Sequence, residues 1–171
     1  QHDPASFRPL YNRYYEPIFR FVNKRTDDLS LSGDICSLVF LKAMQRLKDY
    51  TFQGVPFSAW LFRIASNEVA QHYRSTKKTR VVSIESHPLS EMIDELDEGN
   101  NEQVRTALIE SLEDLRPQDL TIIEMRFFEQ RPFKEIADIL GITESNAKVR
   151  TYRVLERLKK FIVKKLPNSE F

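Results

Sequence analysis

The sequence is poor in the residues that mark several protein classes. Its 171 residues include only four Gly, a scarcity that favours helix, and one Cys, which excludes an internal disulfide. No apolar run approaches the roughly 18 residues of a membrane span, so we expect no membrane insertion. The single Cys36 is expected to be a small packed hydrophobe, in keeping with a reducing cytoplasm.

Signatures of enzymes and metal sites are also missing. The sequence has no glycine-rich phosphate loop and no nucleophile next to a plausible base. His2, His72 and His87 lack metal-ligand spacing, and His72 is expected on a helix surface or near a phosphate. We therefore predict no enzymatic activity, no cofactor and no metal.

What the sequence does have is a strong segregation of charge beneath a net charge of +1. Residues 1–80 carry 13 Lys and Arg against 7 Asp and Glu, whereas residues 81–104 carry 7 acids and no Lys or Arg. The scarcity of Gly and the abundance of Leu, Ile, Arg, Glu and Lys favour helix. We predict an all-α fold with two small helical domains, residues 1–80 and 104–171. An acidic flexible linker, residues 81–103, joins them and contains Pro88 and Gly99 as helix breakers.

Apolar spacing predicts three helices in the N-terminal domain. The first begins after a cap at Asp3, and Pro17 is expected to kink or interrupt it. A loop over residues 26–33 precedes a second helix from Asp34 to Leu47. The third helix begins at Phe57, and its Trp60 is expected to be buried against the first helix.

The third helix also has a polar side. Arg63, Asn67, Gln71, Arg74 and Lys78 follow one another at steps of three or four residues, over roughly 22 Å of helix at 1.5 Å per residue. A cationic face that carries amides suits a phosphate backbone with room for contacts to base edges. The alternative is an ordinary solvated side of an amphipathic helix.

The C-terminal domain has the pattern of a helix-turn-helix. Ala137 is small where two helices cross, Gly141 supplies a positive φ in the turn, and Thr143 can cap the next helix. Along that next helix, the residues predicted to point inward are Ala147, Val154, Leu158 and Ile162. The outward residues predicted to bind DNA are Asn146, Lys148, Val149, Tyr152 and Arg153.

The two halves together resemble the extracytoplasmic-function sigma factors, the small two-domain initiation subunits of bacterial RNA polymerase. The resemblance is carried by FSAWLFRIASNEVAQHYR in the first half and by LEDLRPQDLTIIEMRFFEQRPFKEIADILGITESNAKVRTYRVLERLKK in the second. It extends from about Phe7 to Phe161 and leaves the linker unmatched.

The resemblance implies a role for each half in promoter binding. In the second half, the outward residues of the helix-turn-helix would bind the −35 element, and the resemblance adds Arg150 to them. Residues implied at the −10 element are Thr51, Phe52, Gln53, Arg63, Asn67, Gln71, Arg74, Lys77 and Lys78. Residues implied in polymerase binding are Asp34, Phe40, Leu41, Lys42 and Arg46. The implied partners are core RNA polymerase, promoter DNA and an anti-sigma factor.

Three questions stay open at this level. Ser37 and Leu38 stand where the family usually has a Gln-Glu pair, and Leu38 is either core or a polymerase contact. Either Phe52 or Tyr50 can offer a stacking face for a base, or each is a core plug. The alternative function is a two-domain helix-turn-helix regulator that senses a ligand and does not bind core polymerase.

The acidic segment suggests a further hypothesis. Tethered acids have a high effective concentration near the basic faces. Glu91, Asp94, Glu95, Asp97 and Glu98 would then contact Arg63, Arg74, Lys77, Lys78 or the Lys148–Arg157 face and weaken stray DNA binding. The alternative is a solvated tether that only repels DNA.

Overall fold

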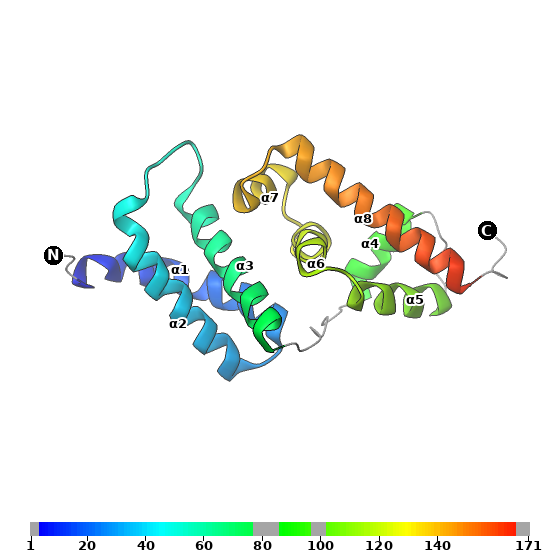
Figure 1. Cartoon of the computed structure of the whole chain (residues 1–171), viewed down its shortest axis with the longest axis horizontal. Coiled ribbons are helices and arrows are strands. Elements are labelled where there is room, and N and C mark those ends of the chain that lie inside the picture. The colour runs from blue at the N-terminus through cyan, green and yellow to red at the C-terminus, as the bar shows by residue number, and fades with distance from the viewer. Residues whose placement is uncertain (1–3, 77–85, 97–101, 167–171) are drawn as a thin grey trace. The chain divides into compact units, whose positions relative to one another are not determined.

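Helix-favouring composition leads to an all-helical chain, as predicted (Figure 1). The computed structural model describes residues 4–76, 86–96 and 102–166. The chain divides into two compact units, Gln1–Val81 and Val82–Phe171. Within the described ranges, no helix combines the length and the apolar character needed to cross a membrane.

The N-terminal unit is a bundle of three helices, α1 (Pro4–Thr26), α2 (Leu29–Arg46) and α3 (Phe57–Thr76), each packed on the other two (Figure 1). A short 3-10 turn, η1 (Leu47–Asp49), extends α2. Each helix contributes an apolar stripe to one core, because residues three and four apart share a helix face. Fully or nearly fully buried members of this core include Ile18, Val22, Ile35, Val39, Leu61 and Ala65.

Proline does not interrupt the first helix. The α1 helix contains both Pro9 and Pro17, whereas we expected a kink or break at Pro17. A proline at position 17 leaves the carbonyl of Arg13 without its helical donor. Both Pro17 and Arg13 are exposed. Water can therefore satisfy the freed carbonyl, and α1 continues through Pro17 without the break that we expected. The predicted cap at Asp3 lies outside the described residues.

The second helix starts five residues earlier than predicted. Asp28 caps it, because its Oδ1 accepts a hydrogen bond from the backbone N–H of Leu31 at 2.9 Å. The hydroxyl of buried Ser32 donates to the Asp28 carbonyl at 2.6 Å and lies 3.0 Å from Asn23 Oδ1. The Asp and Ser residues of segment 26–33 are thus a cap and the first turn of a helix. Within segment 26–33, Asp27 has a left-handed backbone conformation with a φ of 51°, which is uncommon for a residue other than glycine.

The C-terminal unit packs its other helices against one side of its long last helix. Its elements are α4 (Ser86–Leu96), α5 (Glu102–Glu113), α6 (Pro117–Ile123), the π-helical η2 (Glu124–Phe128), α7 (Phe133–Leu140) and α8 (Glu144–Lys165) (Figure 1). The α8 helix packs on α5, α6 and α7. The inward residues predicted for α8 are confirmed, since Ala147, Val154, Leu158 and Ile162 are all buried.

The α4 helix corrects the predicted extent of the linker. We assigned all of residues 81–103 to a flexible connection, but Ser86–Leu96 forms a helix that packs on η2, α5 and α8. The cause is an apolar pair among the acids: Met92 and Ile93 are 0% and 1% exposed. Burial of this pair ties α4 to the C-terminal unit. The predicted breakers in this segment give no boundary at Pro88, which lies within the first turn of α4.

Candidate nucleic-acid interfaces

The turn between α7 and α8 has the geometry that its residues predict. Gly141 adopts a left-handed conformation with a φ of 68°, and the N–H of Ile142 donates to the Ala137 carbonyl at 3.0 Å. The Thr143 hydroxyl accepts from the N–H of Asn146 at 3.2 Å and caps α8. These local contacts fix the direction in which α8 leaves the turn.

The outer face of α8 carries all the residues that we predicted for it. Asn146, Lys148, Val149, Arg150, Tyr152 and Arg153 are exposed. Tyr152 is 50% and Val149 43% exposed, so neither large side chain belongs to the core. Thr151 lies between them in sequence but is buried, and its hydroxyl donates to the Ala147 carbonyl at 2.9 Å. Asn146 Oδ1 accepts from Arg150 Nε at 3.1 Å, which aligns two polar groups along this face.

Phe133, the first residue of α7, lies against this face. Its ring centroid is 4.6 Å from Cζ of Arg126, 5.9 Å from Nζ of Lys148 and 6.4 Å from the ring centroid of Tyr152. Lys148 also lies 3.1 Å from a carboxylate oxygen of Glu144. Arg126 comes from η2, so two elements besides α8 contribute to the surface. Sequence analysis missed Arg126 and Phe133, because no helical periodicity relates either residue to α8.

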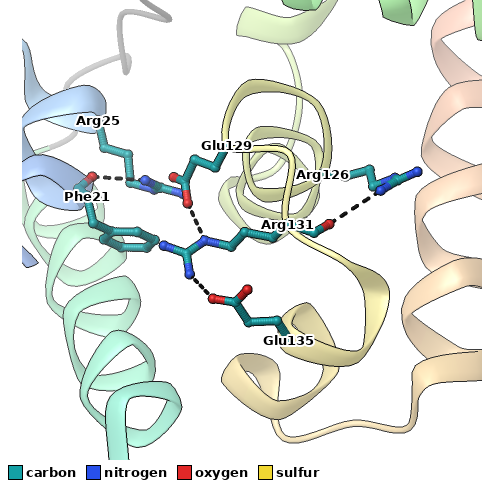
Figure 2. A network of polar contacts seen from close by, with 6 residues as sticks. All are labelled: Phe21, Arg25, Arg126, Glu129, Arg131 and Glu135. Carbon is teal, nitrogen blue, oxygen red and sulfur yellow. Dashed lines mark hydrogen bonds and ion pairs between the residues drawn. The ribbon is translucent and has the colours of Figure 1, made fainter. Parts of the chain in front are cut away.

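A polar network holds the connection between η2 and α7 (Figure 2). Arg131 Nε lies 2.5 Å from a carboxylate oxygen of Glu129, and the same guanidinium pairs with Glu135 on α7. Arg126 Nη1 donates to the Arg131 carbonyl at 3.4 Å. The N–H of Arg131 donates in turn to the Met125 carbonyl at 2.9 Å. This short connection therefore sets where Phe133 stands relative to Arg126.

In the N-terminal unit, the polar side of α3 is retained over its described length. Asn67, Gln71 and Arg74 are exposed and Arg63 is half-buried. Arg74 Nη2 donates to Gln71 Oε1 at 3.2 Å. The predicted continuation at Lys77 and Lys78 lies outside the described residues.

The loop before α3 separates the two candidates for a stacking face. Phe52 is 73% exposed, and Thr51 and Gln53 beside it are exposed too. Tyr50 is half-buried, and its hydroxyl donates to the Val55 carbonyl at 3.2 Å. Tyr50 therefore packs within the base of the loop, whereas the ring of Phe52 is exposed to solvent.

Trp60 belongs to the base of this loop rather than to the deep core. We expected it to be buried against the first helix, but it is half-buried and lies 5.1 Å from the ring of Tyr50 and 5.3 Å from that of Phe57. Phe57 makes the contact to α1, with its ring 5.4 Å from that of Tyr14. The adjacent Leu61 is 0% exposed and takes the core position that we gave to Trp60.

The predicted polymerase-binding residues of α2 divide between surface and core. Asp34, Leu41 and Arg46 are exposed, but Phe40 is only 4% exposed. The Phe40 ring packs on those of Phe7, Tyr11 and Tyr15 in α1 at centroid distances of 6.4, 4.8 and 6.1 Å. In this structure its side of the helix is therefore turned toward α1 and not toward solvent.

The surroundings of Lys42 and Leu38 on α2 are also defined by the structure. Lys42 Nζ lies 2.6 Å from Glu68 on α3, so its charge is partnered inside the unit. Leu38, which sequence left open between core and surface, is 46% exposed, and Leu41 three residues later is 45% exposed. The neighbouring Ser37 is exposed as well. An apolar pair therefore marks the outer face of α2.

The core of the same helix contains the only cysteine of the chain. Cys36 is 0% exposed, and burial raises the pKa of its thiol to about 11. A thiol in this environment is protonated at neutral pH and packs as a small hydrophobe.

Comparison with known proteins links both units to one family. The family model for Sigma-70 region 2 matches residues 10–79, and the model for Sigma-70, region 4 matches residues 105–158. The chain is 29% identical over 164 residues to the ECF RNA polymerase sigma factor BldN of Streptomyces coelicolor, covering 92% of this chain and 60% of that protein. It is 25% identical to the RNA polymerase sigma factor SigZ of Bacillus subtilis, over 90% of this chain and 85% of the relative.

A solved structure shares the fold. The chain matches the sigma factor RpoE from Bartonella quintana, solved in complex with the anti-sigma factor NepR, with a TM-score of 0.54. The match covers 96% of this chain and 99% of the other at 17% sequence identity.

Proposed function

The chain belongs to the extracytoplasmic-function sigma factors, and from this premise we propose that it binds bacterial core RNA polymerase and directs it to promoters. The C-terminal unit binds the −35 element, and the N-terminal unit binds polymerase and helps to open the −10 element. The observation that carries the proposal is the exposed cationic and aromatic face of α8 behind a capped helix-turn-helix turn.

At the −35 element, α8 enters the major groove. Arg153 can bind a guanine edge with two hydrogen bonds, and Tyr152 and Val149 supply apolar contacts to base edges. Lys148, Arg150 and Asn146 bind phosphates and fix the register of the helix without reading sequence. Arg126, which stands on the Phe133 ring beside Lys148, extends the cationic edge of this face.

At the −10 element, the loop before α3 captures an extruded base. Extrusion costs a few kcal/mol of stacking and pairing, and stacking on an aromatic ring returns about 1–3 kcal/mol. The 73% exposure of Phe52 supports its role as the stacking ring, with Thr51 and Gln53 beside it. The polar side of α3, from Arg63 to Arg74, follows the DNA backbone.

The outer face of α2 is the polymerase-binding surface in this proposal. The exposed pair Leu38 and Leu41 forms its apolar centre, and Asp34 and Arg46 form its charged rim. Phe40 and Lys42 hold this surface in position without being part of it, because Phe40 packs on α1 and Lys42 pairs with Glu68 on α3. The protein supplies binding and DNA remodelling in the bacterial cytoplasm, and polymerase carries out the chemistry. An anti-sigma factor is the further partner, as it is for the structural relative.

Run-off transcription with purified bacterial core polymerase on promoters of the native genome tests this function. We expect specific start sites that depend on the protein. A Leu38→Asp, Leu41→Asp variant should lose polymerase binding and keep binding to −35 duplex. The matched control is Leu29→Asp, on the same helix at 71% exposure, which should transcribe normally. If the parent binds specific duplexes but never polymerase, the protein is instead a helix-turn-helix regulator.

A further inference from the structure

The ring of Phe133 is the common neighbour of three side chains that face outward around α8: Arg126, Lys148 and Tyr152. We propose that Phe133 is a positioning residue, which holds these three side chains in their DNA-binding arrangement before DNA arrives. The inference rests on the proposed function in one respect, that α8 binds duplex DNA.

Attraction between cations and the π-face explains why two like charges share one ring. Arg126 at 4.6 Å and Lys148 at 5.9 Å both lie within the range of about 6 Å over which a ring attracts a cation. Glu144 holds Lys148 from a second side at 3.1 Å. Without the ring, mutual repulsion and side-chain freedom would separate the two cations. Phe133 has no hydroxyl, so it acts through its neighbours rather than by a hydrogen bond to phosphate.

The position of the ring is itself fixed. Phe133 opens α7 directly after the connection that Arg131 holds through Glu129 and Glu135 (Figure 2). Arg126 donates to the Arg131 carbonyl at 3.4 Å while its guanidinium lies over the ring. The guanidinium is therefore held by a hydrogen bond and by an aromatic face together.

This arrangement reduces the cost of binding DNA. Arg and Lys are the side chains that lose the most rotamer freedom when they are ordered. Side chains that are already ordered in the free protein lose less freedom on binding, which raises affinity without any new contact. Holding Tyr152 also sharpens the sequence preference, because a fixed ring fits fewer base edges than a mobile one.

The test uses the full chain and a duplex selected from a random pool with the parent protein. Phe133→Leu keeps an apolar side chain but removes the π-face. We expect it to weaken binding about three- to tenfold and to broaden the selected sequence. Phe133→Tyr keeps the ring and should restore binding to within about twofold of the parent. The matched control is Phe161→Leu on α8, which removes a ring 5.1 Å from Nζ of Lys165 and should leave DNA binding unchanged.

A double-mutant cycle separates positioning from general stability. In an Arg126→Gln, Lys148→Gln background, Phe133→Leu should cause only the small loss that remains through Tyr152. Thermal unfolding of each variant gives the folded fraction at the assay temperature. The same loss in both backgrounds, a loss that follows the folded fraction, or no loss at all would each overturn the inference. If the parent protein selects no preferred sequence from the random pool, −35 recognition is overturned instead. The double-mutant cycle, measured on random duplex DNA, then decides the role of Phe133.

Discussion

The proposed binding surfaces of the two units, the outer face of α8 and the outer face of α2, are built in different ways. In the C-terminal unit, a glycine in the turn and a threonine cap set the course of α8 within a few residues. In the N-terminal unit, the outward face of α2 depends on how α1 and α3 pack on it, and both Phe40 and Lys42 face those neighbours. A binding surface set by local geometry is therefore predictable from spacing, whereas one set by packing is not.

The largest expected effect tests whether packing of Phe40 against α1 sets the orientation of α2. Phe40→Ala should destabilise the N-terminal unit by about 3–5 kcal/mol, because it removes a buried ring from among three aromatic neighbours. Binding of −35 duplex by the C-terminal unit should persist. Leu41→Ala, at 45% exposure, should change stability by at most about 0.5 kcal/mol and should weaken polymerase binding.

Cys36 reports the unfolding of this unit, since it is the only thiol in the chain and is fully buried. Its pKa of about 11 in the folded unit lies above the ordinary value of 9.0. The folded thiol is therefore inert to alkylation at pH 8, and an unfolded one reacts. Phe40→Ala should raise the labelling rate by about two to four orders of magnitude. A stable Phe40→Ala protein that fails only in polymerase binding would return Phe40 to the contact surface.

The raised pKa of Cys36 also predicts that this unit loses stability as pH rises from about 9 toward 11.

The next largest effect distinguishes base readout from phosphate contacts on the outer face of α8. Arg153→Ala should cost about 1–3 kcal/mol on the preferred duplex and relax the preference at one or two positions. Lys148→Ala should weaken all sequences alike and reduce the salt slope by about one. Sequence selection with each variant across a salt series distinguishes these effects. Unchanged selection by Arg153→Ala would remove Arg153 from base readout.

A smaller effect is expected at the loop before α3. Phe52→Ala should reduce −10 opening by about 1–2 kcal/mol and leave the stability of the unit unchanged, because the ring is 73% exposed. Fluorescence of a base analogue at the −10 position, measured with the polymerase complex, reports opening. The control is Tyr50→Phe, which loses the bond to the Val55 carbonyl but keeps its ring contacts. Full opening by Phe52→Ala, or an equal defect in Tyr50→Phe, would contradict the stacking role.

The difference between surfaces set by local geometry and surfaces set by packing also explains which elements could be predicted from the sequence. The helix-turn-helix and the polar side of α3 follow from helical periodicity. In the turn, Gly141 adds a second signal, because its positive φ strongly favours glycine. The start of α2 and the continuity of α1 through Pro17 could not, because a cap and an exposed proline look like loop signals until their surroundings are known. Arg126 and Phe133 meet through a π-helical stretch and a connection held by Arg131, and neither has a sequence pattern.

The acidic segment was only partly predictable from the sequence. Its charge predicted an interaction with a basic face, but its apolar pair places α4 in the C-terminal unit. There Glu91 accepts a hydrogen bond from Gln130 at 3.1 Å. Glu91, Asp94 and Glu95 line a hollow of about 620 Å³ together with Arg126, Phe127 and Gln130. Asp97 and Glu98, also included in the hypothesis, lie outside the described residues.

This geometry gives the smallest of the expected effects. Carboxylates around Arg126 should lower the attraction of the −35 face for phosphates, and each exposed pair is worth only a few tenths of a kcal/mol to about 1 kcal/mol. We expect Glu91→Gln, Asp94→Asn, Glu95→Gln to bind random duplex about two- to tenfold more tightly at low salt and to converge with the parent at high salt, where the charges are screened. The control removes as many acids from α5 and the turn after it, with Glu102→Gln, Glu113→Gln and Asp114→Asn, none of which lines the hollow beside Arg126. An equal gain in the control would mean that the segment acts through net charge alone. A gain confined to the α4 variant, and abolished by Arg126→Gln, would mean that the position of α4 beside Arg126 is what weakens stray DNA binding.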